Sequence, residues 1–267
     1  MHTPDLPPIG TLIRDWRQRR GRSQLDLACD AEISTRHLSF VETGRARPSR
    51  EMLLHLAELL EVPLRERNAL LLAGGFAPTF RERALDDPAM SAARRAVDLV
   101  LAGHEPFPAI AVDRHWNLVA ANRAIAPLLD GVAPSLLGPP TNVLRLSLHP
   151  DGLGRRIHNY DEWRGHVLAR LKRQVDASAD PVLADLHREL SSYAARPGET
   201  GQRADLPHGG VVLPLRLESP LGVLSLFTTV TVFGTPVDIT LSELALEAFF
   251  PADAATAEVL KSFSRTA

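Results

Sequence analysis

Cysteine and long apolar runs are scarce in this 267-residue sequence. The single cysteine, Cys29, cannot form an internal disulfide, and it does not supply the usual cysteine ligands of a zinc site. We interpret it as a packing or surface residue rather than a redox switch. No stretch reaches the roughly 18 apolar residues of a transmembrane helix, and the N-terminus lacks the pattern of a secretory signal. These absences predict a cytoplasmic protein with no membrane partner.

Signatures of common enzyme classes are missing as well. The sequence has no Walker phosphate loop, no dinucleotide fingerprint, no G-x-S-x-G and no H-E-x-x-H motif. His149, Asp151 and His158 lie around one turn-rich stretch, where solvated loop residues are an alternative to a metal site. We predict no catalytic residues, no metal and no cofactor. A lipid-modifying enzyme with an accessory helical domain is the alternative, because catalytic groups can come together from distant positions.

Positive charge is concentrated in one part of a chain whose formal net charge is -2. Residues 14–50 contain nine arginines against five acidic residues, whereas the remainder of the chain is acidic. A local basic surface, rather than the total charge, attracts a phosphate backbone. The sequence therefore predicts a small basic module joined to a larger acidic region.

The basic module has the pattern of five short helices. Apolar residues recur at helical spacing, Gly21 and Gly44 stand at helix ends, and Ser23 and Ser34 stand where N-caps are expected. Asp26 follows Ser23 by three residues, close to a capping box. The predicted helices cover residues 9–20, 24–31, 35–43, 50–60 and 64–73.

The second and third predicted helices are joined by a tight turn, which is the pattern of a helix-turn-helix. The third helix, TRHLSFVET, has a polar and basic N-terminal end, as expected of a helix that enters the major groove. Leu38 and Val41 would face the core of the module. The residues that would face outward are Thr35, Arg36, His37, Ser39 and Phe40.

The motifs "SQLDLA", "IS" and "LSFVETGRARPS" resemble the lambda-repressor-like, Xre-type helix-turn-helix. The resemblance implies that Gln24 contacts a DNA phosphate. It places Arg45 and Arg47 beside the DNA backbone. The predicted partner is a double-stranded DNA operator. The residues predicted to bind it are Gln24, Ser34, Thr35, Arg36, His37, Ser39, Phe40, Arg45 and Arg47.

Other details of this module bear on the resemblance. It implies an interior salt bridge between Arg17 and Glu42. At the turn before the third helix, Glu32 stands where the family usually has glycine, so a positive φ there would cost about 1 kcal/mol. A solvated helix remains the plainer interpretation of Arg36. The Phe40 ring is compatible with either a thymine methyl contact or packing on a neighbouring domain.

Beyond residue 75 the pattern mixes helices and strands. Two β-prone runs meet near Trp116 and Asn117 and predict a hairpin over 108–122. After a polar loop at 197–210, strands rich in β-branched residues are predicted at 211–218 and 222–234, with a possible third at 236–240. Helices are predicted at 91–102, 123–130, 143–148, 163–175, 180–194, 241–250 and 253–263.

Four stretches of this region resemble the MmyB-like ligand-binding domain: "AVDRHWNLVAAN", "NVLRLSLHPDGL", "NYDEW" and "FTTVTVFGTPVDITLSELALEAFFPADAAT". That domain is PAS-like and follows an Xre-type helix-turn-helix in bacterial regulators. The pattern of five short helices predicts an all-α N-terminal domain. The order of a hairpin, helices and long antiparallel strands predicts a C-terminal α+β, PAS-like domain with an antiparallel sheet, in agreement with the resemblance. We predict a helix-turn-helix domain at 1–75, a linker with a connecting helix at 76–105, and a ligand-binding domain at 106–267.

The function predicted from these features is a sequence-specific transcriptional regulator that senses a small hydrophobic ligand. The resemblance implies a fatty-acid-like ligand, and two copies of the chain would bind a near-palindromic site as a homodimer. Arg145 is the candidate partner of a ligand carboxylate, although an ion pair with Asp113 or Glu162 would also explain it. Asn122 is also a candidate helix cap. The predicted ligand-binding residues are Trp116, Asn122, Arg145, Trp163 and Phe227.

Overall fold

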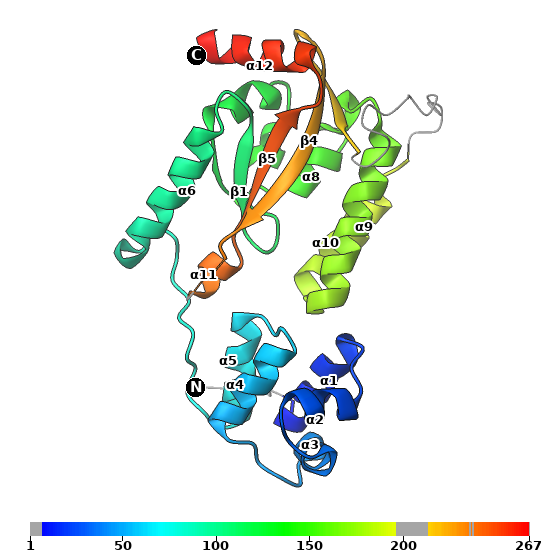
Figure 1. Cartoon of the computed structure of the whole chain (residues 1–267). Helices are drawn as coiled ribbons and strands as arrows, with labels where there is room; N and C mark the ends of the chain where they lie inside the picture. Colours follow the sequence, from blue (N-terminus) through cyan, green and yellow to red (C-terminus); the bar gives the residue numbers. More distant parts are fainter. Residues whose placement is uncertain (1–6, 196–212, 235, 237, 267) are drawn as a thin grey trace. The chain divides into compact units, whose positions relative to one another are not determined.

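The computed structural model describes residues 7–195, 213–234, 236 and 238–266. The chain divides into two compact units. Figure 1 shows the chain coloured along its sequence, from blue at the N-terminus to red at the C-terminus. The first unit comprises Met1–Ala84 together with Thr235–Ser242, and the second comprises Leu85–Gly234 and Glu243–Ala267. A short piece that is distant in the sequence thus belongs by its contacts to the N-terminal unit. No helix of the described residues is both long and apolar enough to cross a membrane.

Within its described residues 7–84, the first unit contains five α-helices, as the sequence predicts. In three of them the hydroxyl of Ser23, Ser34 or Ser49 accepts a hydrogen bond from the backbone N–H three residues further on, which satisfies an otherwise unpaired donor. Ser23 and Asp26 form a complete capping box. The helices are α1 (Ile9–Arg19), α2 (Gln24–Asp30), α3 (Thr35–Glu42), α4 (Arg50–Leu59) and α5 (Leu64–Ala73).

All five helices contribute to one apolar core. Its members lie on one face of each helix, at the spacing that the sequence shows. They include Ile13, Trp16, Leu27, Ala28, Leu38, Val41, Leu53, Leu56, Leu60 and Leu70. The core fixes the orientation of α3, because Leu38 and Val41 are completely buried.

The turn between α2 and α3 confirms the unusual role of Glu32. This residue has φ of 54°, a left-handed conformation that costs a residue with a side chain roughly 1 kcal/mol. The turn is held by the Ile33 N–H, which donates to the carbonyl of Ala28 at 3.0 Å. The helix-turn-helix geometry is therefore kept without glycine.

The second unit is built on a five-stranded antiparallel sheet with strand order β2-β1-β5-β4-β3. This arrangement confirms the predicted α+β domain with an antiparallel sheet. Because β5 pairs with both β1 and β4, the last strand of the chain lies at the centre of the sheet. The strands are β1 (Ala109–Val112), β2 (Leu118–Ala121), β3 (Leu215–Ser219), β4 (Gly222–Val232) and β5 (Ala245–Pro251).

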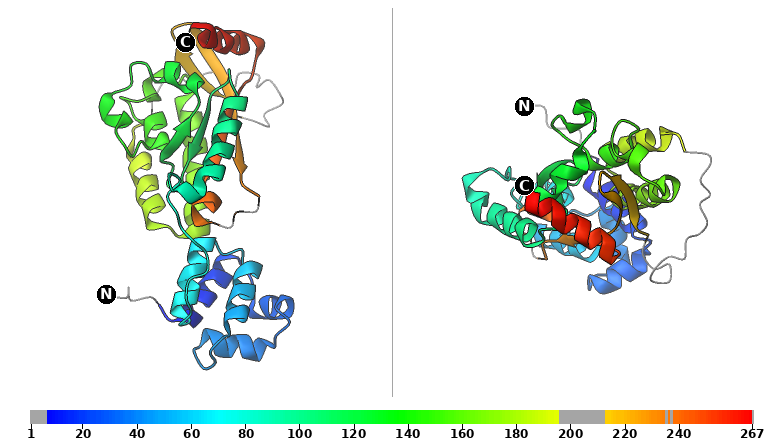
Figure 2. Two further views of the ribbon diagram at one scale, coloured as in Figure 1. Left: turned by 90° about the vertical axis from the view of Figure 1, so that its left-hand side faces the viewer. Right: turned by 90° about the horizontal axis from the view of Figure 1, so that it is seen from above.

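Helices cover the two faces of this sheet unequally (Figures 1 and 2). On one face, called here the outer face, α6 (Ser91–Gly103) packs through Val97 and Leu101. The other, inner face carries the main core of the unit. The further elements are η1 (Pro88–Met90), η2 (Arg123–Leu129), α7 (Pro134–Leu137), α8 (Val143–Leu148), η3 (Gly154–Arg156), α9 (Tyr160–Ser178), α10 (Pro181–Ser192), α11 (Ile239–Ser242) and α12 (Ala254–Thr266).

Two predictions near the C-terminus are wrong. The segment 241–250, predicted as a helix, contributes most of β5, and the possible strand at 236–240 leads instead into α11. Alanine, leucine and glutamate favour a helix, but β1 and β4 offer hydrogen-bonding edges on both sides of the segment. Sheet pairing therefore overrides local propensity. In α11 the Asp238 carboxylate accepts the Thr240 N–H at 3.0 Å, which closes a helical turn.

The structure also differs from the sequence prediction at 123–130, whereas two helix caps of the second unit are formed by Asn142 and Asp253. The segment 123–130 forms a 3-10 helix that contains Pro127, and the Asn122 side chain makes no capping hydrogen bond to it. Asn142 caps α8 by accepting the Arg145 N–H at 3.1 Å. Asp253 caps the last helix by accepting the Thr256 N–H at 2.7 Å. The predicted loop 197–210 lies outside the described residues.

Candidate DNA interface and candidate ligand site

The side of α3 that faces away from the core carries most of the predicted DNA-binding residues. Ser34 caps the helix through its hydroxyl, which accepts the His37 N–H at 3.1 Å. Arg36 is exposed, and Thr35 is partly exposed. An exposed helix N-terminus with short polar side chains and a guanidinium is suited to base edges and phosphates in the major groove.

Phe40 lies between two of the predicted arginines. The guanidinium carbon of Arg36 is 5.3 Å from the centre of the Phe40 ring, and that of Arg45 is 5.9 Å from it. Both distances are within the range of cation–π attraction. The ring thus restrains two flexible cations on one surface, which lowers the conformational entropy that they lose on binding.

The remaining residues of the predicted set are found around the same helix. His37 and Ser39 are partly exposed on α3, and Arg47 is exposed in the loop that follows. Gln24, at the start of α2, is partly exposed, and its amide donates to the Glu42 carboxylate at 2.7 Å. This amide is therefore held in place by a residue of α3.

A buried carboxylate joins α1, α2 and α3. Both oxygens of Glu42 accept hydrogen bonds from Arg17, at 2.7 and 3.0 Å, which is the predicted interior salt bridge. Arg14 lies 3.6 Å from the same carboxylate. Burial raises the pKa of Glu42, but the hydrogen bonds from Arg17 and Gln24 outweigh it, so the pKa is lower than usual. Glu42 thus stays ionised and holds α3 in position.

The inner face of the sheet in the second unit also contains a buried charge. Glu247, at the centre of β5, is only 6% exposed and accepts a hydrogen bond from Arg170 of α9 at 3.0 Å. The Arg170 guanidinium covers the Trp116 ring at 4.3 Å from its centre. Buried charges need such partners.

His166 lies one helical turn before Arg170. Burial lowers the pKa of His166, and the positive charges of Arg170 and Arg173 lower it further. The ring stacks on Trp163, with 5.8 Å between the ring centres. The helix face of α9 that is near Glu247 therefore combines two arginines with a histidine that favours its neutral form.

Coverage of the inner face changes along β4. Leu224 and Leu226 are fully buried, whereas Val230 and Val232, on the same face, are 45% and 62% exposed. In the sheet Val230 pairs with Glu247, so apolar surface and the buried charge are adjacent. The described residues thus leave uncovered an apolar strip next to a charged group.

The five predicted ligand-binding residues are spread over the second unit. Trp116 and Trp163 belong to the inner core, and their indole N–H groups donate to Gln174 and Ser147, at 2.8 and 2.9 Å. Phe227 lies on the outer face and stacks on Phe250, with 5.3 Å between ring centres. Trp116, whose ring lies under the Arg170 guanidinium, and Trp163 therefore lie on the same side of the sheet as Arg170.

Asn122 has a structural role in the second unit. Its amide nitrogen donates to the carbonyls of Leu101 and Phe107, and its oxygen accepts the Ala109 N–H. The side chain is buried, and these bonds use its donors and its acceptor. It joins α6 to the start of β1.

Arg145 forms an ion pair, but neither of the two expected partners provides it. Its guanidinium donates to both oxygens of Glu189 in α10, at 2.6 and 2.7 Å. The Tyr193 hydroxyl donates to the same carboxylate at 2.7 Å. Burial and this hydrogen bond raise the pKa of Tyr193. The cluster joins α8 to α10.

Replacement of Arg145 by glutamine is expected to destabilise the second unit only modestly. The side chains of Arg145 and Glu189 are 38% and 36% exposed, so solvent screening limits the loss to about 1 kcal/mol. If the domain binds the fatty-acid-like ligand that the family resemblance implies, we expect its affinity in the variant to stay within about twofold of wild type, because the guanidinium already has a carboxylate partner. Urea unfolding and titration with dodecanoate measure the two quantities. A loss of binding without a loss of stability would restore Arg145 as a ligand partner.

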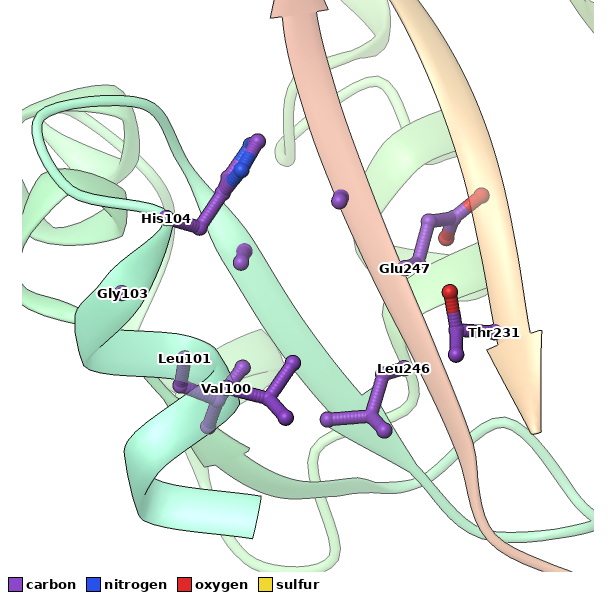
Figure 3. A pocket seen from close by; sticks show the side chains of 9 residues that line it. Val100, Leu101, Gly103, His104, Thr231, Leu246 and Glu247 are labelled. Atoms are coloured by element: carbon purple, nitrogen blue, oxygen red, sulfur yellow. The ribbon is translucent and has the colours of Figure 1, made fainter. Parts of the chain in front are cut away.

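A cavity of about 150 Å³ lies between α6 and the outer face of the sheet. Figure 3 shows Val100 and Leu101 opposite Leu246, with His104 and Thr231 nearby. Pockets for drug-sized ligands usually measure roughly 300–1,000 Å³. This cavity is too small for a long acyl chain, and none of the five predicted ligand residues lines it.

Sequence reasoning missed Arg170 and Glu247. Glu247 lies within the segment 241–250, for which the sequence predicts a helix, and in a helix a glutamate is expected on the solvent side. As a strand, the same segment alternates, so that Glu247 shares the inner face with Ala245 and Phe249. A signal for the site was therefore present in the period-2 pattern. Among the described residues, no group of three or more His, Cys, Asp or Glu side chains could hold a metal ion.

The fold and these sites define a class of protein. A helix-turn-helix unit and an α+β ligand-binding unit together are the parts of a ligand-responsive, DNA-binding transcription regulator. A family model described as "MmyB-like transcription regulator ligand binding domain" matches residues 93–263, and one described as "Helix-turn-helix domain" matches residues 8–70. The chain belongs to the MmyB-like transcription regulator family. No curated protein matches the sequence.

Proposed function

We propose that this regulator reads a DNA operator through α3 and that a fatty-acid-like ligand in the second unit controls its binding. In this proposal the regulator is of the bacterial Xre type, is cytoplasmic, acts as a homodimer and has no catalytic activity. The observation that carries the DNA-binding part is the outward surface of α3. There Arg36 and Arg45 lie over Phe40, while Leu38 and Val41 anchor the opposite side.

The residues of this surface take different roles in the proposal. Arg36, Thr35 and Phe40 contact base edges, since they project from the exposed side of α3. Arg45, Arg47 and Gln24 contact the phosphate backbone, which positions the protein without identifying the sequence. Two copies related by a twofold axis would place their α3 helices about one DNA turn apart.

Replacing Arg36 with alanine is expected to relax discrimination at one base pair of each half-site, by about 1–3 kcal/mol. Replacing Arg47 with alanine should instead weaken binding to all sequences and reduce the salt dependence by about one unit of slope. Operator fragments are first selected from genomic DNA with the wild-type protein, and affinities are then measured at several salt concentrations.

The control for these variants is Arg94→Ala, which removes an exposed arginine of α6 in the second unit. It should leave both affinity and salt slope unchanged. If Arg36→Ala retains the wild-type base preference at every position, Arg36 does not identify bases. If the wild-type protein binds no duplex at low salt, the proposal of a DNA-binding function is wrong.

We propose that the ligand lies on the uncovered strip of the inner face. The exposed Val230 and Val232 offer apolar surface for an acyl chain. Arg170 has guanidinium donors beyond the one that it gives to Glu247, and they suit a carboxylate head. Trp116, whose ring the Arg170 guanidinium covers, and Trp163 are buried on the same side of the sheet.

Titration of the protein with dodecanoate tests this site. Val230→Asp places a carboxylate on the strip and should weaken binding about tenfold or more, because the acyl chain loses apolar contact and meets a charge. Val223→Asp is the matched control, since Val223 is 42% exposed on the outer face of the same strand. Equal losses in the two variants would exclude the strip as the ligand site.

A further inference from the structure

The connection between β4 and β5 belongs to the first unit rather than to the sheet from which it comes. Residues Thr235–Ser242 group by their contacts with the N-terminal unit, and α11 within them lies against α5. A connection between two strands normally runs over the surface of its own domain. This one is instead part of the unit that carries the helix-turn-helix.

The connection is held by backbone and side-chain bonds to the segment that follows α5. The Ile239 N–H donates to the Arg81 carbonyl at 2.8 Å, and Asp238 and Arg81 form a parallel β-bridge. The Thr240 hydroxyl donates to the Arg83 carbonyl at 2.6 Å. Arg83 lies 3.6 Å from the Asp238 carboxylate. These contacts involve three successive residues of the connection.

Burial supports the same conclusion. Ile239 is 2% exposed and Asp238 is 3% exposed, values that are typical of a packed core rather than of a loop tip. One oxygen of Asp238 is buried and makes no hydrogen bond within the described residues. Its charge is compensated by Arg83. If the connection left this position, the Ile239 side chain would be exposed and the partly buried ion pair of Asp238 and Arg83 would separate.

The segment at 79–83 is in turn fixed to α5. The Asn68 side chain accepts the N–H groups of Thr79 and Phe80 and donates to the Phe80 carbonyl. A continuous series of hydrogen bonds thus leads from α5 to the connection. Asn68 belongs to the helix that supplies Leu70 to the core of the first unit.

The connection also has a fixed origin in the sheet. Val232 at the end of β4 pairs with Ala245 at the start of β5, so the chain leaves and re-enters the sheet at adjacent positions. We infer that the β4–β5 connection transmits ligand occupancy from the sheet to the DNA-binding unit. This inference rests on the proposed function, because the proposed ligand strip lies on β4, a few residues before the connection. A ligand that shifts β4 against β5 changes the strain on Ile239 and Asp238, and hence on α5.

Hydrogen exchange of the full chain, without ligand, tests whether the connection is docked. We compare wild type with Ile239→Asp, and with the milder double variant Arg83→Gln/Thr240→Val. Arg81→Gln is the matched control, because Arg81 contributes its backbone to the bridge. The amides of 79–83 and 239–242 should exchange slowly in wild type and in the control. They should exchange at least about tenfold faster in the two test variants, since local opening becomes easier.

DNA affinity with and without dodecanoate tests transmission. We expect dodecanoate to change wild-type affinity for a selected operator by about fivefold or more, as is usual for coupled sites. In Ile239→Asp and in the double variant the change should fall to within about twofold. Dodecanoate affinity itself should remain near that of wild type, because the ligand strip is not altered.

The results of the two experiments test the inference separately from the proposed ligand. An unchanged dodecanoate effect in variants whose connection exchanges rapidly would overturn the inference. Rapid exchange of 79–83 and 239–242 in wild type would also overturn it. If dodecanoate does not bind wild type, the proposed ligand is wrong. In that case the exchange of Ile239→Asp without ligand decides. Faster amide exchange in both α5 and the first residues of β5 supports the inference, and unchanged exchange in either of them overturns it.

Discussion

Replacement of Glu42 by alanine is expected to destabilise the first unit by about 3–5 kcal/mol. The carboxylate is buried and accepts hydrogen bonds from Arg17 and Gln24. Arg17 is 9% exposed and would be left as an uncompensated charge in the core. A domain of this size has only about 5–15 kcal/mol of total stability, so the variant should be largely unfolded in this unit at moderate temperature.

Hydrogen exchange of α1 to α3, together with thermal unfolding, measures this loss in the full chain. Asp30→Ala is the control, because Asp30 forms an exposed ion pair with Arg22 and should cost less than about 1 kcal/mol. DNA binding should be lost with Glu42→Ala and retained with Asp30→Ala. Equal stability of the two variants would contradict a structural role for the buried pair.

The same carboxylate makes the first unit sensitive to acid. Because the pKa of Glu42 is lower in the folded chain than in the unfolded chain, folding favours its ionised form. The stabilisation is complete above the unfolded value for glutamate, about 4.3, and is lost as the pH falls through the folded value. The unfolding free energy of wild type should therefore fall more steeply below pH 4 to 5 than that of Glu42→Gln.

Replacement of Gly10 by alanine is the other large effect that we expect. Alanine normally stabilises a helix by about 1 kcal/mol relative to glycine. In α1, however, a Cβ at Gly10 would lie 2.4 Å from the Val41 carbonyl oxygen and 2.6 Å from that of Glu42. These are backbone atoms of α3 and cannot move without displacing the helix. We expect a net loss of about 1–3 kcal/mol and displacement of α3 from α1.

Gly165→Ala is the matched control for this prediction. Gly165 lies within α9, and a Cβ there would meet nothing within 4 Å. The control should be neutral or stabilising by up to about 1 kcal/mol. Thermal unfolding and operator affinity of both variants are measured together. Wild-type DNA affinity in Gly10→Ala would mean that α3 does not need its close contact with α1.

The helix-turn-helix unit could be predicted almost completely from local features of the sequence. Serine caps, glycine stops and apolar spacing are properties of short segments, and the structure uses them at Ser23, Ser34 and Gly44. The pair formed by Arg17 and Glu42 was predicted from the family resemblance instead. Contact between α1 and α3 is not a local property, and spacing alone does not specify it.

The ligand-binding unit could be predicted in class but less well in detail. The sequence predicts its antiparallel sheet, yet it predicts a helix where the central strand β5 lies, because the composition of this segment favours a helix in isolation. This error concealed Glu247 and therefore its partner Arg170. The alternative strand pattern was weak, since Ala245 and Ala248 have no strong preference for either face.

The candidate ligand site depends on partners that lie far apart in the chain. Arg145 was a reasonable candidate for a carboxylate, but Glu189 in α10 already pairs with it. Arg170 stacks on Trp116 and donates a hydrogen bond to Glu247. Along the chain, several helices or strands separate each of these two residues from Arg170. Which arginine has an available donor is decided by packing and cannot be inferred from residue type.

By itself, the sequence determined the five N-terminal helices, the serine caps of α2 and α3, the outward residues of α3 and the α+β class of the second unit. These features depend on backbone propensity and on apolar periodicity within about ten residues. The tertiary structure alone decided the centre of the sheet, the buried pair of Arg170 and Glu247, and the inclusion of residues 235–242 in the first unit. Each of these depends on the pairing of distant segments, whose energy arises only when both partners are brought together by the fold.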